Sequence, residues 1–117
     1  QTFFVLQDAC FTPLGMEDKR ISKAHLRASS MYDVNHGPWR ARLNRRNRGG
    51  RGAWVSKHKN QKEWIQVDLG TVSRVKGVAT QGRYEANQRV TSYTLGYSID
   101  GNKFRLYRDG RSVKVRI

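Results

Sequence analysis

Hydrophobic and polar positions alternate along the second half of the chain in the pattern of half-buried β-strands. In residues 64–69, Ile65, Val67 and Leu69 fall on one face, and the polar residues between them fall on the other. Residues 72–80 are rich in valine and end in threonine, and both residue types favour extended backbone. Each of the two segments therefore predicts one β-strand.

The next alternating segment predicts a β-hairpin. Residues 90–99 carry large apolar side chains at every second position from 93 onward, and an Asp100-Gly101 turn follows directly. Residues 103–107 then return as the partner strand, and residues 113–117 begin a further alternating stretch. Five side chains are expected in the core: Trp54, Trp64, Tyr93, Leu95 and Tyr97.

The first half of the chain is less regular. Residues 21–30 fit a short amphipathic helix, but Ser29-Ser30, Gly37-Pro38 and an Arg/Gly tract at residues 45–52 interrupt any longer pattern. Long loops beside short strands favour an all-β sandwich whose function resides on its loops. We expect one domain, because 117 residues leave little room for a second core.

Positive charge is concentrated in two segments. The chain carries 23 Lys and Arg against 9 Asp and Glu, which gives a net charge of +14. Residues 40–62 hold nine bases and no acid, and residues 103–117 have a net charge of +5, whereas the rest of the chain is balanced. Patches of this sign attract polyanions such as phospholipid headgroups, sulfated glycans or nucleic acid.

Several classes of function lack their sequence signals. The longest apolar run, residues 3–6, is far shorter than the ~20 residues that a membrane-spanning helix needs. The three histidines lie 11 and 22 residues apart, with no metal-binding spacing among them, and no nucleophile or phosphate-loop motif is present. We therefore expect no enzyme activity, no metal and no cofactor.

A set of short segments occurs in a fixed order across roughly residues 10–110. The set comprises Cys10 with PLGME at 13–17, ASS at 28–30, ARLN at 41–44, AW at 53–54, WIQVDLG at 64–70, TQGR at 80–83, VTSYTL at 90–95 and YSIDG at 97–101. Taken together, the segments resemble the discoidin domain, the C-type module of coagulation factors V and VIII. The resemblance implies a discoidin-type jelly-roll β-sandwich of the galactose-binding-like kind, which is extracellular and non-catalytic.

The resemblance also implies domain limits. Residues 1–9 would be a lead-in, and residues 10–117 would form the discoidin-like domain. The family domain continues for several more strands and closes with a second cysteine that pairs with the one near its start. This chain would then lack those strands. Cys10, its only cysteine, would be a free thiol or half of a bridge to a partner outside the chain.

Three loops would project from one end of the sandwich as ligand-contacting spikes, at residues 31–39, 45–52 and 84–89. Apolar side chains of the first would insert at the headgroup boundary of a membrane, or its aromatic residues would pack back on the sandwich. Arginines of the second would pair with phosphate or sulfate, or would form a solvated loop without a partner. The expected ligand residues are Met31, Tyr32, His36, Trp39, Arg45, Arg46, Arg48, Arg51, Arg83 and Tyr84.

Two arginines have alternative structural roles. Arg83 follows a predicted strand, where it would hold an anionic ligand or form an ion pair with Glu85. Arg42 leads into the body of the domain, and we expect it to pair with Asp68 or another acid of the sheet.

The predicted function is a secreted or extracellular adhesion module that binds an anionic surface, either a phosphatidylserine-type membrane or a sulfated glycan. A second hypothesis keeps the fold and makes the target a matrix or cell-surface protein, such as a collagen-like chain, or a terminal sugar. Nucleic acid is disfavoured as a partner. Residues 48–52 contain barely one RGG copy, whereas RGG segments act in repeated disordered arrays.

Overall fold

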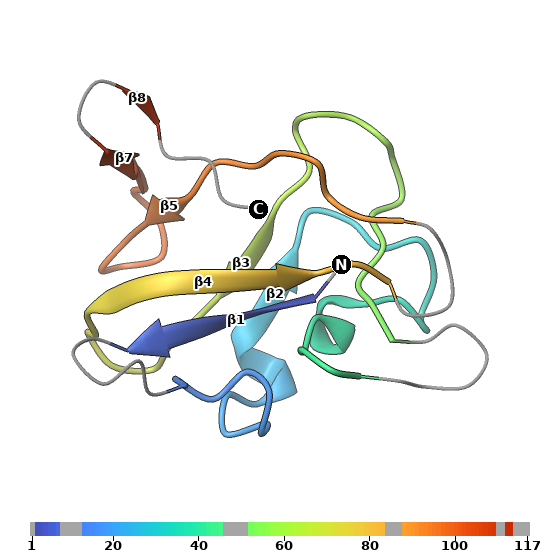
Figure 1. Ribbon diagram of the computed structural model, residues 1–117, viewed down its shortest axis with the longest axis horizontal. Coiled ribbons are helices and arrows are strands. Elements are labelled where there is room, and N and C mark those ends of the chain that lie inside the picture. The colour runs from blue at the N-terminus through green and yellow to red at the C-terminus, as the bar shows by residue number, and fades with distance from the viewer. Residues whose placement is uncertain (1, 8–12, 46–51, 84–87, 110–111, 114–117) are drawn as a thin grey trace.

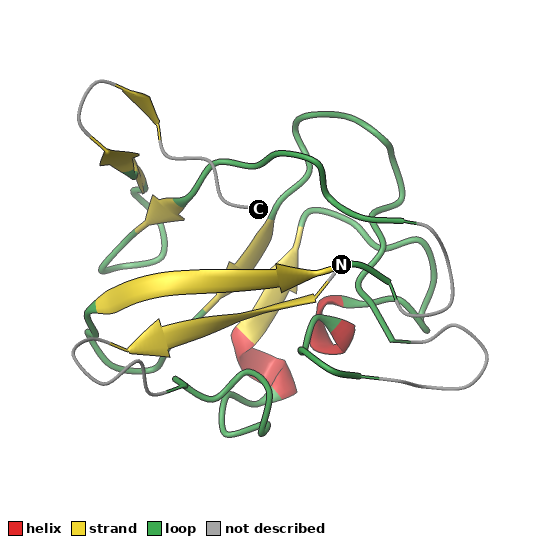
Figure 2. Ribbon diagram, in the orientation of Figure 1, coloured by secondary structure: helices red, strands yellow, loops and turns green. Residues whose placement is uncertain are grey.

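The computed structural model describes residues 2–7, 13–45, 52–83, 88–109 and 112–113. Within these residues the regular structure consists of short β-strands and two single-turn 3-10 helices (Figure 1). Strands form antiparallel pairs, and loops connect the pairs (Figure 2). The described part of the chain is therefore all-β, as the hydrophobic pattern predicts.

The longest pair joins the first strand to a strand from the middle of the chain. β1 (Thr2–Gln7) runs antiparallel to β4 (Val75–Gln81), with Thr2 opposite Gln81 and an irregularity between Leu6 and Gln7. Residues 1–9 were expected to precede the domain. β1 is paired along its whole length with β4, and the domain limit expected at residue 10 stays a prediction.

The second pair replaces the helix expected at residues 21–30. The structure has a 3-10 turn, η1 (Lys23–His25), followed by β2 (Leu26–Ala28), which pairs antiparallel with β3 (Ile65–Val67). The backbone bonds from Asp68 N to His25 O and from Ser29 N to Trp64 O, both 2.9 Å, extend this pairing on either side. Pairing with β3 thus overrides the local helical pattern.

The predicted hairpin is confirmed. β5 (Gly96–Tyr97) pairs antiparallel with β6 (Arg105–Leu106), and the turn between them places Gly101 at a φ of +78°. Positive φ is readily adopted by glycine, which explains the residue at this point of the turn. β7 (Arg108–Asp109) then pairs with β8 (Ser112–Val113), and the rest of the alternating stretch at 113–117 lies outside the described residues.

The described core is a small cluster. Met16, Ile21 and Leu26 are 0%, 5% and 6% exposed and form its centre. A second set of apolar side chains packs against them: Trp39, Val67 and Leu69. The apolar face that the sequence assigns to residues 65, 67 and 69 therefore includes two side chains that contact the core.

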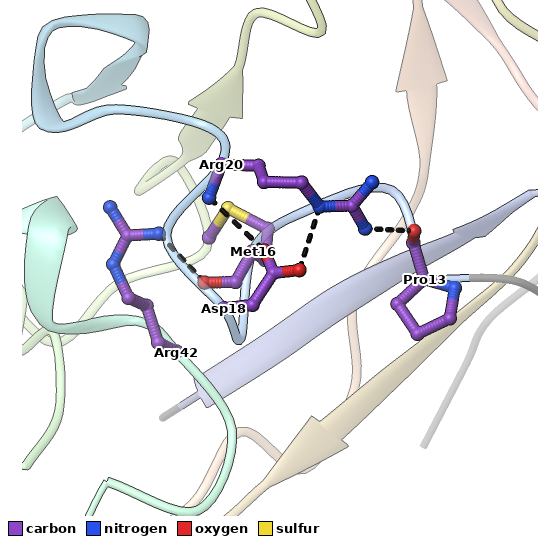
Figure 3. Close-up of polar contacts among 5 residues, drawn as sticks. All are labelled: Pro13, Met16, Asp18, Arg20 and Arg42. Carbon is purple, nitrogen blue, oxygen red and sulfur yellow. Dashed lines mark hydrogen bonds and ion pairs between the residues drawn. The ribbon is translucent and has the colours of Figure 1, made fainter.

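A buried arginine completes the core. Arg42 is 4% exposed and donates from one terminal nitrogen to the Met16 carbonyl at 2.7 Å (Figure 3) and from the other to the Ile21 carbonyl at 2.9 Å. The expected pairing with Asp68 or another acid of the sheet is wrong, because both terminal nitrogens donate to these main-chain carbonyls. The loop that carries Met16 leaves main-chain carbonyls inside the domain without strand partners, and the guanidinium fork satisfies two of them.

The same loop is closed on its outer side by a second arginine. Arg20 donates from Nε to Asp18 at 2.6 Å and from Nη2 to the Pro13 carbonyl at 2.6 Å (Figure 3). The main-chain and side-chain hydrogen bonds from Arg20 hold the pKa of Asp18 below its usual value. Two arginines therefore fix the loop, one from within and one from solvent.

The core includes fewer aromatic side chains than the sequence predicts. Trp54 is 7% exposed, and Tyr93 and Leu95 are half-buried, but Trp64 and Tyr97 are 48% and 55% exposed. The prediction that the last two are core residues is wrong. Among the described residues β5 has β6 as its only strand neighbour, and both side chains line an open groove instead of facing a second sheet.

Candidate functional site

The loop that follows β2 presents apolar side chains to solvent. We call residues 31–36 the tip loop. Within it Met31, Tyr32 and Val34 are 38%, 66% and 70% exposed. Water around such side chains makes their transfer to an apolar environment favourable. The first predicted spike therefore has an exposed apolar tip.

Hydrogen bonds at its base hold the tip loop against residues 54–55. The Tyr32 N–H donates to the Val55 carbonyl at 2.7 Å, and the Val55 N–H donates to the His36 carbonyl at 3.1 Å. The indole N–H of Trp54 donates to the Ser30 carbonyl at 2.9 Å. The exposed side chains are thus carried by a loop whose two ends are fixed.

A glutamate strengthens the same base. The hydroxyls of Ser29 and Ser30 donate to the two carboxylate oxygens of Glu63, at 2.5 and 2.9 Å, and the His58 N–H donates at 3.2 Å. The bonds from Ser29 and then Ser30 lower the pKa of Glu63, because they stabilise its charged form. The carboxylate is therefore charged at neutral pH and holds both serines.

Inside the tip loop, His36 links the first and third predicted spikes. The ring is 8% exposed; its Nδ1 lies 2.5 Å from Asp33 Oδ1, and its Nε2 lies 3.3 Å from Arg83 Nη2. Because a guanidinium only donates, Nε2 accepts, and Nδ1–H donates to Asp33. Arg83 also donates to Gln88 Oε1 at 2.8 Å, and its main-chain N–H bonds the Gln88 carbonyl. His36 and Arg83 were both predicted to bind ligand, and here they join two loops.

The sequence allows two positions for Trp39, insertion into a membrane or packing against the sandwich, and the structure shows the packed one. Its indole contacts the core cluster, and the Lys23 ammonium lies 3.9 Å from the ring centroid in a cation–π contact. A Cβ at Gly37 would overlap the indole ring, so glycine is required there for the tryptophan to fold back. The exposed apolar surface of this spike therefore comes from residues 31, 32 and 34.

Arginines gather where the chain leaves the second 3-10 turn, η2 (Pro38–Arg40). Arg40 and Arg45 are half-buried, and no hydrogen-bond acceptor in the described residues reaches the buried Nε atom of either. Burial first, and then the charge of Arg40, lower the pKa of Arg45. Burial and the charge of Arg45 lower that of Arg42 in the same way. Four other predicted site residues lie outside the described residues: Arg46, Arg48, Arg51 and Tyr84.

Sequence reasoning missed the residues that hold the loops in place. Glu63 directly follows the nine-base segment, so in the sequence it looks like an acid that offsets nearby positive charge. No feature of the sequence connects it to the two serines before the tip loop. Nothing in the sequence around Gln88 or Lys23 indicates that these side chains contact Arg83 and Trp39. A serine pair before an exposed loop is the one feature that could have indicated a clamp at its base.

The described part of the chain contains neither a metal-binding cluster nor a membrane-crossing helix. No group of three or more histidine, cysteine, aspartate or glutamate side chains is placed there to hold a metal ion. Among these residues, no helix combines the length and the apolar character that a membrane crossing requires.

Comparison with known proteins identifies the family. The family model of the F5/8 type C domain matches residues 25–116, which is more than half of the chain. This chain belongs to the F5/8 type C domain family. The match begins just before β2 and includes the tip loop, the arginines that follow it and the hairpin.

Several curated proteins are similar to this F5/8 type C domain. It is 35% identical over 116 residues to lactadherin of Sus scrofa, with 92% of this chain and 28% of that protein covered. It is 35% identical over 114 residues to the EGF-like repeat and discoidin I-like domain-containing protein 3 of Homo sapiens, with 92% and 24% covered. It is 38% identical over 114 residues to coagulation factor V of Mus musculus, with 94% and 5% covered. The chain thus spans between 5% and 28% of the length of these relatives.

Membership of the family settles the general class of the protein. The F5/8 type C domain is a β-sandwich, in agreement with the strands and the near absence of helix in the described residues. As in these relatives, the module is extracellular, which confirms the predicted location. It is a binding module, and the functional question is therefore what its loops bind.

Proposed function

We propose that this F5/8 type C domain binds anionic phospholipid membranes. The tip loop enters the boundary between headgroups and acyl chains, and the arginines beside it bind headgroup phosphates and carboxylates. The observation that carries the proposal is the set of three exposed apolar side chains, Met31, Tyr32 and Val34, on a loop fixed at both ends.

The tip loop has the properties that insertion requires. Tyrosine is favoured at the headgroup level, because its ring is apolar and its hydroxyl stays wet. Full burial of one aliphatic side chain contributes about 1.5–3 kcal/mol. The bonds of Tyr32 and His36 to Val55 already order the loop, so little conformational entropy remains to be lost on binding.

The arginines supply the attraction to negative charge. Near an anionic bilayer each Lys or Arg contributes about 1 kcal/mol. Arg40 and Arg45 are candidates, because both residues are partly exposed and follow the tip loop in the sequence; their Nε atoms are buried, so the contact would be made by the exposed parts of the side chains. Arg42 and Arg83 donate to groups of the domain itself, so they position loops in this proposal and do not contact lipid.

The apolar tip favours a membrane over a sulfated glycan. A glycan would be bound by the basic residues through sulfate groups. It would leave Tyr32 and Val34 in water, and it would not require their exposure. The two targets are therefore distinguished by the contribution of the tip loop.

Co-sedimentation with vesicles tests the proposal. The protein should bind vesicles that contain phosphatidylserine and should not bind pure phosphatidylcholine vesicles. The affinity of the Y32S/V34S variant for these vesicles should be lower by about tenfold or more. Each tenfold loss of affinity corresponds to about 1.4 kcal/mol of lost apolar transfer free energy. The fold of the variant should be unchanged, since both side chains are more than half exposed.

L106S is the matched control. Leu106 is 50% exposed on β6, outside the tip loop, so its replacement should leave vesicle binding unchanged. Equal binding of the parent to both kinds of vesicle would overturn the proposal. So would full vesicle binding by Y32S/V34S. Strong heparin binding that is insensitive to Y32S/V34S, without vesicle binding, would point to a sulfated glycan instead.

A further inference from the structure

The loop that leads into β3 carries positive charge that the proposed membrane contact does not use. We call residues 57–62 the lysine loop, which belongs to the green arc that runs into β3 in Figure 1. Lys57, Lys59 and Lys62 are all exposed, and no acidic residue lies among them. Basic segments of this length and density are typical of patches that bind heparin or nucleic acid. The lysine loop is therefore a candidate polyanion site.

The charge of the lysine loop is not neutralised within the described residues. No ion pair among them involves Lys57, Lys59 or Lys62. The acid that directly follows the loop, Glu63, accepts hydrogen bonds from two serines and a main-chain N–H at the base of the tip loop. Ammonium groups are stable in water, so the loop needs no other part of the fold to cover it. Its three charges thus remain available to a ligand.

Hydrogen bonds hold the backbone at the start of the lysine loop. The Lys57 N–H donates to the Ser30 hydroxyl at 3.0 Å, and the His58 N–H donates to a Glu63 carboxylate oxygen at 3.2 Å. The Ser56 hydroxyl donates to the His58 carbonyl at 2.8 Å. Binding to a backbone that is already held costs less conformational entropy than binding to a free loop. The main entropic cost that remains is the ordering of the lysine side chains.

The side chains of the lysine loop suit a sulfated glycan better than a membrane. All residues of the loop are polar, so it has no apolar side chain to enter a bilayer. Asn60 and Gln61 add exposed amide groups, which can donate hydrogen bonds to sugar hydroxyls and accept them. The Lys62 N–H donates to Asn60 Oδ1 at 2.8 Å, so the amide nitrogen of Asn60 is the atom that a sugar would contact. Lysine ammonium groups are compact point charges that can pair with single sulfate groups.

We infer that the lysine loop binds a sulfated glycan and that this site is distinct from the membrane contact of the tip loop. The ammonium groups of Lys57, Lys59 and Lys62 pair with sulfates along the glycan chain, and the amides between them bond sugar hydroxyls. A nucleic acid is less suitable, because the loop has no tyrosine, phenylalanine or tryptophan on which bases could stack. The inference does not rest on the proposed membrane binding, since the two sites use different side chains.

Titration with a heparin-derived oligosaccharide tests the inference. K57Q/K59Q/K62Q removes three charges and keeps polar side chains at exposed positions, so the fold should be unchanged. The dissociation constant for the oligosaccharide should rise about tenfold or more, which corresponds to about 1.4 kcal/mol or more. Binding by this variant should also depend less steeply on salt, because fewer counterions are displaced. The chemically desulfated oligosaccharide should bind the parent far more weakly than the sulfated one.

R27Q/R89Q/K103Q is the matched control. It removes the same charge from three exposed positions outside the lysine loop. Its dissociation constant for the oligosaccharide should change by less than about threefold, because distant bases are screened by salt. Vesicle binding by K57Q/K59Q/K62Q should stay close to that of the parent, and Y32S/V34S should keep its heparin binding.

Equal losses of heparin binding in the two triple variants would show a response to net charge alone and would overturn the inference. Full heparin binding by K57Q/K59Q/K62Q would overturn it as well, as would a parent that does not bind heparin. An equal loss of vesicle binding in this variant would make the loop a headgroup contact and would also contradict it. Absent vesicle binding by the parent, together with heparin binding that depends on the three lysines, would overturn the proposed membrane function alone.

Discussion

At the scale of single residues, the arginines differ in what their guanidinium groups contact. Arg42 donates to two main-chain carbonyls, Arg20 to Asp18 and a carbonyl, and Arg83 to a glutamine and a histidine. Arg40 and Arg45, by contrast, have buried Nε atoms without an acceptor in the described residues. The net charge counts all five arginines equally, whereas the hydrogen-bond partners identify Arg42, Arg20 and Arg83 as arginines with structural roles.

Replacement of Arg42 by methionine tests its structural role. R42M would leave the Met16 and Ile21 carbonyls buried without their donors. The free energy of unfolding should fall by about 2–6 kcal/mol, since each of the two unsatisfied buried carbonyls costs about 1–3 kcal/mol. Urea denaturation followed by tryptophan fluorescence measures this change.

Two variants serve as comparisons for R42M. R27M removes an exposed arginine from β2 and should change the free energy of unfolding by less than about 0.5 kcal/mol. R42K keeps the charge but lacks the planar fork that reaches both carbonyls, so its loss should be intermediate. Equal stability of R42M and R27M would contradict the role assigned to the buried guanidinium.

At the scale of elements, the turn of the β5–β6 hairpin is organised by one carboxylate. Asp100 Oδ1 accepts the N–H groups of Asn102 (2.8 Å) and Lys103 (3.0 Å) and the Ser98 hydroxyl (2.9 Å). The bonds from Lys103, then Asn102, then Ser98 lower the pKa of Asp100 from 3.8 to about 2. The native state therefore binds fewer protons than the unfolded state between these two values.

This shift predicts a defined acid dependence. The contribution of Asp100 to stability is fully present above its unfolded pKa of 3.8 and is lost as pH falls through about 2. D100N keeps an acceptor oxygen in the turn but cannot titrate. Its free energy of unfolding should therefore depend less on pH in this window than that of the parent. Carboxyl-carbon NMR titration checks the cause, and an Asp100 that titrates near 3.8 would contradict the prediction.

The elements also explain how far the sequence predicts the fold. The hairpin is predictable because Asp100-Gly101 specifies its turn locally. The helix expected at residues 21–30 fails because β2 depends on β3, a partner distant in sequence that local periodicity does not report. Alternation also predicts that Tyr97 shares a face with Tyr93, Leu95 and Ile99, but it carries no information on what covers that face. The same pattern places Trp64 on the face of Gln66 and Asp68, so alternation gives no reason to expect it in the core.

The candidate site, too, is predictable from the sequence only where nearby residues determine it and not where distant contacts do. Exposure of Met31 and Tyr32 agrees with their polar surroundings in the sequence, so this part of the first spike could be anticipated. The folding back of Trp39 depends on contacts with Lys23 and the core, which lie elsewhere in the chain. The clamp of Glu63 on Ser30 is likewise a long-range contact, and neither residue marks it alone.

At the scale of the whole molecule, exposed apolar side chains and positive charge are distributed differently. Apart from Leu106, the large exposed apolar residues of the described chain fall in the tip loop or in the groove. The excess charge lies at residues 40–62 and 103–117, whereas the groove lining is nearly balanced. The apolar tip and the basic segments are thus made of separate side chains, so each can be altered without the other.

The location of the charge, as distinct from its total, can be tested with two variants of equal net charge. Replacement of Arg45, Arg46, Arg48 and Arg51 by serine removes four positive charges from +14 and leaves +10. Replacement of Lys103, Arg105, Arg108 and Arg111 by serine removes the same number from the other basic segment. Binding to phosphatidylserine vesicles should fall steeply in the first variant and only slightly in the second. Each engaged base contributes about 1 kcal/mol near an anionic bilayer, whereas distant bases are screened by salt.

The salt dependence of vesicle binding is a second measurement that distinguishes the two variants. When fewer bases engage the membrane, fewer counterions are displaced, so vesicle binding by the first variant should depend less steeply on salt than that of the parent. The second variant should keep the parent's salt dependence. Equal losses in both variants would mean that the vesicle surface responds to net charge alone, and the segment at 40–62 would then have no specific role. A loss confined to the second variant would transfer the headgroup contact to residues 103–117, where the remaining excess of positive charge lies.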